Sequence, residues 1–369
     1  MYIDEKAITF VVHGLYEGIH PTLKSSITYK LITSIEKLFP NSSTIFSTWE
    51  DYEYLDILQR QHPRIKLVLT PDPGDLTPYH LNKKGFNLNK NNVNRHILSS
   101  IQGLKKVTTK YSCLLRPDFV FQNSNLSTIY QKLATNQVTP KKIPLKQQIL
   151  APFFGSIRSS YNSIYPSRIY PFHPSDIFHF GLTEDLIKMW DCDLMKPYDF
   201  HYYLNEERGK SKLSATYNSE NIFKFLPEQY IFTSFLKRHG LIQEEDYIHM
   251  EDAPEKYLDT SDKIIRSLFI FASFREIGLS WQRHDAPTIN LPNILFNDRA
   301  LVIGPIGKHL SMYSPLIRYK NWYHSLASMI KYILIYVFEL SIAIINLLIK
   351  YIIKKGIRIA KIIYNELKG

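Results

Sequence analysis

The chain has 369 residues, of which 44% are hydrophobic and 14% aromatic, so global disorder is excluded and a substantial core is expected. Its formal net charge of +11 favours polyanionic partners such as phosphorylated substrates, anionic lipid or nucleic acid. Cys113 and Cys192 are the only cysteines, which excludes a disulfide framework and a zinc site and favours a reducing cytosol. The first residues lack a basic segment and a long apolar run, so no signal peptide is expected.

The first third of the chain alternates between buried-strand and helical patterns. Apolar runs predict strands at 7–12, 44–47, 66–69 and 111–115, and helical spacing predicts helices at 22–39, 54–61 and 93–108. Strands that alternate with helices form a parallel, doubly wound sheet, so the predicted fold class is α/β. In such sheets ligands bind at the carboxyl ends of the strands.

The middle of the chain is less regular. Residues 156–174 are rich in Ser, Tyr, Pro and Arg and are expected to form a loop on the acceptor side. A strand or turn is predicted at 175–181, and helices are predicted at 182–190 and 227–238. Residues 242–315 contain short strand-like pieces.

Polar residues follow the first two predicted strands. His13 and Gly14 come after the first strand, and Trp49, Glu50 and Asp51 come after the second. In nucleotide-binding α/β folds an acid at this place holds a ribose or base edge, and a Trp stacks on the base. The structural alternative is a buried Trp followed by solvated acids at a helix start.

The segment 91–118 predicts a helix, a turn and a buried strand with a carboxylate at its tip. Asn94 and Arg95 open the helix, where they and the nearby amides would face a diphosphate. Arg116 and Asp118 follow the strand. They either organise phosphate charge or form an ion pair that closes the strand end.

Two further segments contain candidate groups. Asp176 and His179 lie in an otherwise apolar run, where they contact the acceptor, bind a metal or are satisfied core residues. Glu228 follows Pro227 at a predicted helix start, where it is either a general base or ordinary helix-start composition. The P-loop, zinc-protease and serine-hydrolase motifs are absent, and no recognised nucleic-acid-binding pattern is present.

Together these blocks resemble a known family. The sequences ITFVVHG, IFSTWED, DPG, NVNRHILSSIQGLKK, LLRPDF and DIFHFGLTEDL are similar, in this order, to blocks of the WavE lipopolysaccharide-synthesis family of glycosyltransferase-like bacterial proteins. The resemblance is dense in the first half and thin to about residue 315. It implies a Rossmann-like family-A glycosyltransferase (GT-A) fold with a mostly parallel sheet, and sugar transfer to lipopolysaccharide core or a related surface glycan.

For the expected transfer reaction we assign roles to the candidate residues. The donor-binding residues would be His13, Gly14, Trp49, Glu50, Asp51, Asn94, Arg95 and Arg116, the catalytic residues Asp118 and Glu228, and the acceptor-side residues Asp176 and His179. Arg116 stands where family-A enzymes have the first Asp of an Asp-x-Asp pattern. Two alternatives stay open: Asp118 binds Mg²⁺ or Mn²⁺, or the guanidinium of Arg116 replaces the cation.

The C-terminal segment 321–369 differs from the rest of the chain. It carries seven Lys and Arg against two Glu, which is about half of the net charge. Residues 332–349 are almost wholly apolar, and the polar residues Glu339, Asn346 and Lys350 fall on one side of a helix. We expect an amphipathic helix that lies in the membrane surface; a membrane span or packing on a partner protein are the alternatives.

These observations predict a GT-A-like domain over residues 1–320 and a basic, membrane-associating helix over 321–369. The expected partners are a nucleoside diphosphate sugar, a lipid-linked or core oligosaccharide acceptor and an anionic membrane surface, without nucleic acid. The expected location is peripheral, on the cytoplasmic face of the inner membrane. The alternative functions are a sugar nucleotidyltransferase and a non-catalytic scaffold of a glycan assembly complex.

Overall fold

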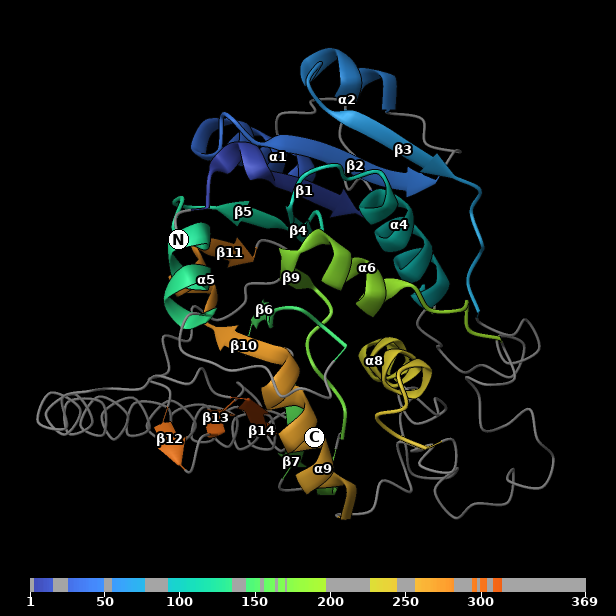
Figure 1. The fold of residues 1–369 in the computed structure, drawn as a ribbon, viewed down its shortest axis with the longest axis vertical. Coiled ribbons are helices and arrows are strands. Elements are labelled where there is room, and N and C mark those ends of the chain that lie inside the picture. Colours follow the sequence, from blue (N-terminus) through green and yellow to red (C-terminus); the bar gives the residue numbers. More distant parts are fainter. Residues whose placement is uncertain are drawn as a thin grey trace, which may run out of the picture. The chain divides into compact units, whose positions relative to one another are not determined.

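Seven strands form one sheet in the computed structural model of the chain (Figure 1). The structure describes residues 3–15, 26–49, 55–76, 92–134, 144–152, 156–162, 165–169, 171–196, 226–243, 256–281, 294–296, 299–303 and 308–313. The strands are β1 (Ile8–His13), β2 (Ser43–Trp49), β3 (Lys66–Thr70), β4 (Tyr111–Leu115), β5 (Phe119–Phe121), β6 (Ile149–Pro152), β7 (Ile157–Asn162), β8 (Tyr165–Ile169), β9 (Phe178–Leu182), β10 (Phe269–Ala272), β11 (Leu279–Trp281), β12 (Ile294–Phe296), β13 (Arg299–Ile303) and β14 (Lys308–Tyr313). The helices are α1 (Ile27–Leu38), α2 (Leu55–Gln61), α4 (Val93–Lys105), α5 (Leu126–Ala134), α6 (Thr183–Trp190), α8 (Pro227–Arg238), α9 (Lys256–Leu268) and α10 (Phe274–Ile277), with a 3-10 turn at Glu5–Ala7.

The strand order of the sheet is β10-β6-β9-β4-β1-β2-β3. Every pair of neighbouring strands is parallel except the two pairs formed by β9. The prediction of an α/β fold with a mostly parallel sheet is therefore confirmed. Two smaller sheets accompany it: β11 pairs with β5, and β12, β13, β14, β7 and β8 form a five-stranded sheet.

The strand order reverses between β1 and β4. From β1 the chain builds β2 and β3 on one side, and α4 then carries it back to β4 on the other side of β1. Ligands of open α/β sheets bind outside the carboxyl ends of the strands at such a reversal. The fold therefore directs attention to the residues that follow β1 and β4.

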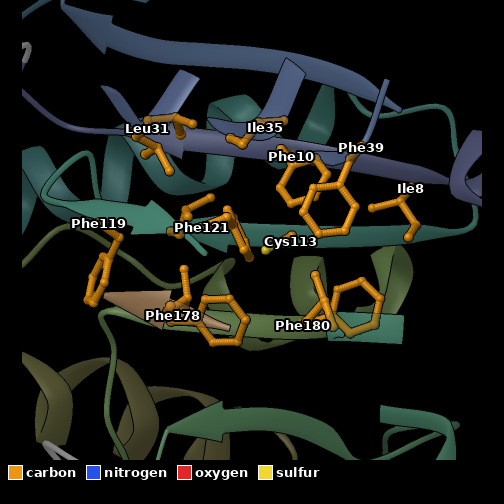
Figure 2. Packing of buried hydrophobic residues seen from close by; sticks show 14 of the residues in the cluster. Ile8, Phe10, Leu31, Ile35, Phe39, Cys113, Phe119, Phe121, Phe178 and Phe180 are labelled. Carbon is orange, nitrogen blue, oxygen red and sulfur yellow. The ribbon is translucent and has the colours of Figure 1, made fainter. Parts of the chain in front are cut away.

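Two apolar layers cover the two faces of the sheet. Alternate side chains of β1 point to opposite faces. Phe10 packs with Phe39 and Phe121, as Figure 2 shows, in the layer that contains α1 and α5. Val11 packs with the layer of α4, α6 and α8. Burial on both faces explains why β1 is a continuous apolar run in the sequence.

Helix α4 lies unusually close to the sheet. A Cβ atom on Gly103 would lie 2.5 Å from Cγ1 of Val11 and 2.9 Å from Cβ of Ser47. Both neighbours belong to central strands and are fully buried, so they have little room to move. Glycine at this position permits the close approach that packs the last turn of α4 against β1 and β2.

Several elements differ from the prediction. Helix α4 ends at Lys105 instead of extending to residue 108, and β7 and β8 form a hairpin where a loop was expected. Helix α9 lies within the region predicted to hold strand-like pieces. Its buried positions include the polar residues Ser261 and Asp262 as well as Ile265.

The chain divides into two compact units, residues 1–289 with 295–316, and residues 290–294 with 317–369. The predicted C-terminal helix lies outside the described residues, so its structure stays a prediction. Within the part of the chain that the structure describes, no helix is both long and apolar enough to cross a membrane. Cys113 is buried in the core, as expected, and both cysteines are free.

Candidate functional site

The first group of predicted site residues lies at the carboxyl end of β1. His13 is the last residue of the strand and is 1% exposed. Gly14 follows with φ +109°, a conformation that residues with a side chain rarely adopt, and its N–H donates to the carbonyl of Ser47 at 3.0 Å. The position of a Cβ on Gly14 is 3.8 Å from Cδ of Pro117. Gly14 thus turns the chain beside the end of β4.

Arg116 and Asp118 form an ion pair at the end of β4. Nη2 of Arg116 lies 2.6 Å from Oδ2 of Asp118, and Nε1 of Trp281 donates to the same oxygen at 3.0 Å. The Asp118 side chain is 2% exposed, whereas that of Arg116 is 27% exposed. The buried carboxylate therefore holds a guanidinium that stays accessible at the sheet edge.

Trp281 reaches this place through strand pairing that sequence reasoning missed. Strand β11 runs antiparallel to β5, which sets Trp281 opposite Phe119 with ring centroids 6.1 Å apart. The two residues are far apart in the sequence, and β11 has only three residues. No local pattern in the sequence could have revealed this contact.

The residues around Asp118 do not suit a divalent cation. Its Oδ2 accepts from Arg116 and Trp281, and a guanidinium this close repels a second cation. Its Oδ1 is buried and has no hydrogen-bond partner among the described residues. In the described ranges, no group of three or more His, Cys, Asp or Glu side chains could hold a metal ion. One remaining buried oxygen is a poor basis for a site that requires several hard oxygen ligands.

Aromatic rings pack together beside the carboxyl end of β1 and the amino end of β9. The rings of His13 and His96 are stacked with centroids 4.7 Å apart, and Trp190 of α6 lies 5.0 Å from His96. Burial lowers the pKa of His13 well below its usual value, and it also lowers the pKa of His96. Both imidazoles are therefore neutral at neutral pH. His96 directly follows Arg95 on α4, but it was not predicted as a site residue.

Asp176 and His179 occupy different environments, although three residues separate them. Nδ1 of His96 lies 3.3 Å from Oδ2 of Asp176, so this carboxylate contacts one ring of the stack. His179 accepts from Nε1 of Trp190 at 3.0 Å and contacts the carbonyl of Ser175 at 2.8 Å. Burial lowers the pKa of His179 to about 4. Both ring nitrogens of His179 are thus used inside the protein.

Glu228 lies in the first turn of α8, directly after Pro227. Its Oε2 is 3.7 Å from Nε2 of the buried His173, and about a quarter of its side chain is exposed. Burial, and then the negative charge of Asp176, raise the pKa of Glu228 to about 8, although the positive charge of Arg116 opposes the rise. Glu228 therefore lies beside the buried His173, and the charges of Asp176 and Arg116 act on its carboxyl group.

Local hydrogen bonds hold the start of α8 against this region. The side chain of Gln229 donates to the carbonyl of Pro171 at 2.9 Å and accepts from the N–H of Leu226 at 3.3 Å. Phe172 has φ 55°, and its N–H donates to Oγ of Ser261 at 2.6 Å. These contacts place His173 and Glu228 next to each other, which the sequence did not indicate.

A second cluster lies at the ends of β2 and β3. The guanidinium carbon of Arg95 is 5.4 Å from the ring centre of Trp49, and its Nε donates to Oδ1 of Asp72 at 2.7 Å. Nη1 of Arg95 donates to Oδ1 of Asn92 at 2.8 Å. The hydrogen bond from Arg95 lowers the pKa of Asp72. Arg95 thus reaches the predicted nucleoside side, whereas Glu50 and Asp51 lie outside the described residues.

Asn94 lies beside Arg95 but serves a different contact. Its carboxamide donates to the carbonyl of Met195 at 2.9 Å and accepts the N–H of the same residue at 2.8 Å. The side chain is 5% exposed. In the structure Asn94 fixes the segment that follows α6, and it is separate from both ion pairs.

A cavity of about 540 Å³ among the described residues lies elsewhere. It is an open groove at the amino end of β4 and includes Lys110, Lys146 and Glu184 in its lining. This is the edge of the sheet opposite to the predicted site residues, and none of them lines it. Because the strand-order reversal points to the carboxyl ends, we place the candidate site there.

Comparisons with known proteins agree with the sequence resemblance. The family model described as WavE lipopolysaccharide synthesis matches residues 8–334, which is most of the chain and confirms the resemblance. No curated protein matches the chain.

Among solved structures, a 4-diphosphocytidyl-2C-methyl-D-erythritol synthase from Anaerococcus prevotii DSM 20548 matches with 12% identity and a TM-score of 0.31, over 53% of this chain and 82% of its own. A second structure of a synthase with this name matches with 10% identity and a TM-score of 0.27, over 50% and 78%.

Proposed function

Because the chain belongs to the WavE lipopolysaccharide synthesis family, we propose that it transfers a monosaccharide from a nucleoside diphosphate sugar to lipopolysaccharide core or a related cell-surface glycan. One observation carries the proposal. A partly exposed cation, Arg116, and a carboxyl group of raised pKa, Glu228, lie within electrostatic reach of each other beside the strand-order reversal. Sugar transfer needs both kinds of group, one for the leaving diphosphate and one for the acceptor proton.

Arg116 is the proposed partner of the diphosphate. As the bond between the sugar and the diphosphate breaks, negative charge develops on the leaving oxygen, and a guanidinium can contact two phosphate oxygens at once. Asp118 holds this guanidinium in place from the buried side. In this proposal Asp118 contributes to catalysis by positioning Arg116, and it does not bind a metal ion.

Glu228 is the proposed general base. The acceptor hydroxyl oxygen attacks the anomeric carbon of the donor, and the hydroxyl proton passes to the carboxylate of Glu228. A carboxylate with a pKa near 8 is a stronger base than an ordinary glutamate, and the share of molecules in which it is ionised grows as the pH rises toward 8. The neighbouring Asp176 would face the acceptor side, and His179 would support it through Ser175.

The nucleoside end would bind at the ends of β2 and β3. Trp49 would stack on the base, with Glu50 and Asp51 on the ribose, and His13 and Gly14 at the end of β1 would flank the diphosphate. Arg95 would reach the diphosphate by exchanging part of its contact with Asp72. The arrangement of α4, β4 and the following carboxylate supports the GT-A assignment, since it matches the layout that the family resemblance implied.

A consequence of the Arg116 role is metal independence, because the cation that usually neutralises the diphosphate would be replaced. We expect transfer to survive EDTA with little loss. Complete loss with EDTA that Mn²⁺ restores would show that Asp118 still binds a cation, and would refute this part of the proposal.

The segment 321–369 is the proposed membrane attachment, on the cytoplasmic face of the inner membrane. Each Lys or Arg near an anionic surface adds about 1 kcal/mol of attraction. A chain that ends at Tyr323 should bind donor but work poorly on a membrane-embedded acceptor. Flotation with liposomes of graded anionic content tests this: binding that ignores lipid charge and high salt would favour a spanning helix.

The decisive experiment for the function is a screen of nucleoside diphosphate sugars by thermal shift, followed by mass analysis of the products with a core oligosaccharide acceptor. Transfer of one sugar is the expected result. Release of pyrophosphate from a nucleoside triphosphate and a sugar 1-phosphate would identify a nucleotidyltransferase instead. Absence of both donor binding and donor hydrolysis would indicate a scaffold protein.

A further inference from the structure

The carboxylate of Asp72 has no part of its own in the function proposed so far. Asp72 follows the carboxyl end of β3, where the nucleoside diphosphate is proposed to bind, and its partner Arg95 lies in the first turn of α4. Arg95 is a proposed ligand of the diphosphate, so Asp72 and the donor would bind the same guanidinium. The contacts of this ion pair determine how the two can share it.

Asp72 binds Arg95 in the way that a phosphate group would. Nε of Arg95 donates to Oδ1 of Asp72 at 2.7 Å, and Nη2 donates to Oδ2. Nη1 donates to Oδ1 of Asn92 at 2.8 Å, and the guanidinium carbon lies 5.4 Å from the ring centre of Trp49. A guanidinium binds carboxylates and phosphates with the same two parallel hydrogen bonds. The carboxylate therefore takes one edge of the guanidinium that would suit a phosphate, and Asn92 takes part of what remains.

The pair also offsets the charge that would attract a diphosphate. The hydrogen bond from Arg95 lowers the pKa of Asp72, so this carboxyl group is ionised at neutral pH. The two side chains are only 21% and 25% exposed, so solvent screens their charges incompletely. A diphosphate that approaches Arg95 thus meets a carboxylate of its own sign next to the cation.

A backbone turn holds the Asp72 carboxylate independently of Arg95. The N–H of Gly74 donates to Oδ1 of Asp72 at 2.9 Å, and Gly74 has φ 74°, a conformation that residues with a side chain rarely adopt. This hydrogen bond remains when Arg95 turns toward a ligand, and the carboxylate is exposed enough to bind water. Asp72 can therefore release Arg95 and bind it again.

We propose that Asp72 is an internal competitor of the nucleotide, which binds Arg95 in exchange for the diphosphate and so limits the affinity of the site for the nucleoside diphosphate. The inference rests on the proposed sugar transfer, in which the nucleoside diphosphate is the product that must leave after the sugar has moved. The exchange breaks and forms hydrogen bonds only. Its consequence is faster release of the product.

The test measures nucleotide affinity in the full-length protein by isothermal titration calorimetry with UDP, GDP, CDP and ADP. Asp72→Asn keeps the size of the side chain and an oxygen for Gly74, but it removes the charge that competes for Arg95. We expect this variant to bind nucleotide about two- to fivefold more tightly than the wild type, the range set by a partly exposed ion pair. Arg95→Gln should weaken binding about tenfold or more, because the charged donor itself is lost.

The dissociation rate tests the release of product. A fluorescently labelled nucleotide is bound to the protein and displaced by an excess of unlabelled nucleotide in a stopped-flow instrument. Asp72→Asn should release the label about two- to fivefold more slowly than the wild type, since differences in affinity between related complexes lie mostly in this rate. An unchanged dissociation rate would contradict the role in product release.

Two controls separate competition for Arg95 from a general effect of charge. In the Arg95→Gln background, Asp72→Asn should bring no further gain in affinity, because the guanidinium for which Asp72 competes is gone. Asp191→Asn removes a carboxylate of the same kind from an exposed ion pair at the other end of α4, where Oδ1 of Asp191 lies 2.9 Å from Nζ of Lys105. This variant should leave nucleotide affinity unchanged.

Unchanged or weaker nucleotide binding in Asp72→Asn would overturn the proposal and show that Asp72 positions Arg95 for the ligand. A gain that persists in the Arg95→Gln background would overturn it as well, because the charge of Asp72 would then act without Arg95. Absence of nucleotide binding in every variant would refute the proposed function together with this inference. The expected order of affinities without any sugar transfer would support the exchange and refute the transfer alone.

Discussion

Two arginine–aspartate pairs lie at strand ends of the same sheet, and they differ in how the aspartate is buried. Asp72 and its partner Arg95 are both about a quarter exposed or less, at 25% and 21%. Asp118 is 2% exposed, and its partner Arg116 is 27% exposed. In the Arg95–Asp72 pair both side chains are exposed to a similar extent. In the Arg116–Asp118 pair the carboxylate is buried and the guanidinium is accessible.

This difference determines what each pair can do. A partly exposed pair contributes about 0–1 kcal/mol to stability in most cases. Arg95 contacts both carboxylate oxygens of Asp72, so it can turn toward a ligand only by giving up part of this bidentate contact. A carboxylate without solvent keeps its partner, because leaving it unpaired costs several kcal/mol. The buried carboxylate suits the role proposed for Arg116 at the leaving diphosphate, and the shared exposure of the other pair suits the reversible binding proposed for Arg95.

The largest expected effect is on stability when the buried pair is broken. Arg116→Leu leaves the Asp118 carboxylate with Trp281 as its only donor among the described residues, and we expect the free energy of unfolding to fall by about 3 kcal/mol. Arg95→Leu is the control and should cost about 1 kcal/mol or less. Urea titrations of both variants measure the contrast. Equal losses would show that the two environments do not differ in energy.

The next effect is on catalysis. Asp118→Asn removes the charge that holds Arg116, so transfer should fall by about 10²- to 10³-fold, in line with the loss of one charge-stabilising group. The fold should persist, because the amide still accepts from Trp281 and Arg116 can reach solvent. Asp72→Asn, the matched change in the exposed pair, should lose about tenfold or less. Near-normal turnover of Asp118→Asn would show that the catalytic site does not lie at the end of β4.

The contrast also shows what the sequence can predict. Both arginines and Asp118 were predicted as site residues, because they follow strands or open a helix in a βα pattern whose geometry is regular. The reversal between β1 and β4 then brings the tips of successive strands together. The first half of the sheet was predictable for the same reason, since its strands are continuous apolar runs.

Other contacts could not be predicted, because they depend on distant pairing. Trp281 reaches Asp118 through β11, and His173 reaches Glu228 through a turn that Gln229 and Ser261 hold. The ring contacts of His96 with His13 and Trp190 join three elements, although the position of His96 on α4 was predicted. Burial of a carboxylate, which separates the two arginine pairs, is a property of the whole fold and not of a motif.

Two tryptophans extend the comparison with smaller effects. Trp281 contacts the buried pair through its N–H, whereas Trp49 contacts Arg95 through its ring face. Trp281→Phe removes a donor to a charged group and should lower the free energy of unfolding by about 1.5–3 kcal/mol. Trp49→Phe keeps a ring beneath the guanidinium and should cost about 1 kcal/mol or less. Chemical denaturation of the two variants in parallel decides whether the hydrogen bond, and not ring volume, is responsible.

The smallest effect concerns the pH dependence of the exposed pair. Arg95 lowers the pKa of Asp72 from its usual value of 3.8, so the folded chain binds this proton less tightly than the unfolded chain does. The pair's contribution is therefore fully present above about pH 4 and is lost as pH falls through the folded-state pKa. Asp72→Asn should cost about 0–1 kcal/mol at pH 7, and this difference should shrink in 1 M salt and vanish in acid. Unfolding free energies of both proteins between pH 7 and pH 2 provide the measurement. A difference that persists unchanged in acid would show that the charge of Asp72 is not its cause.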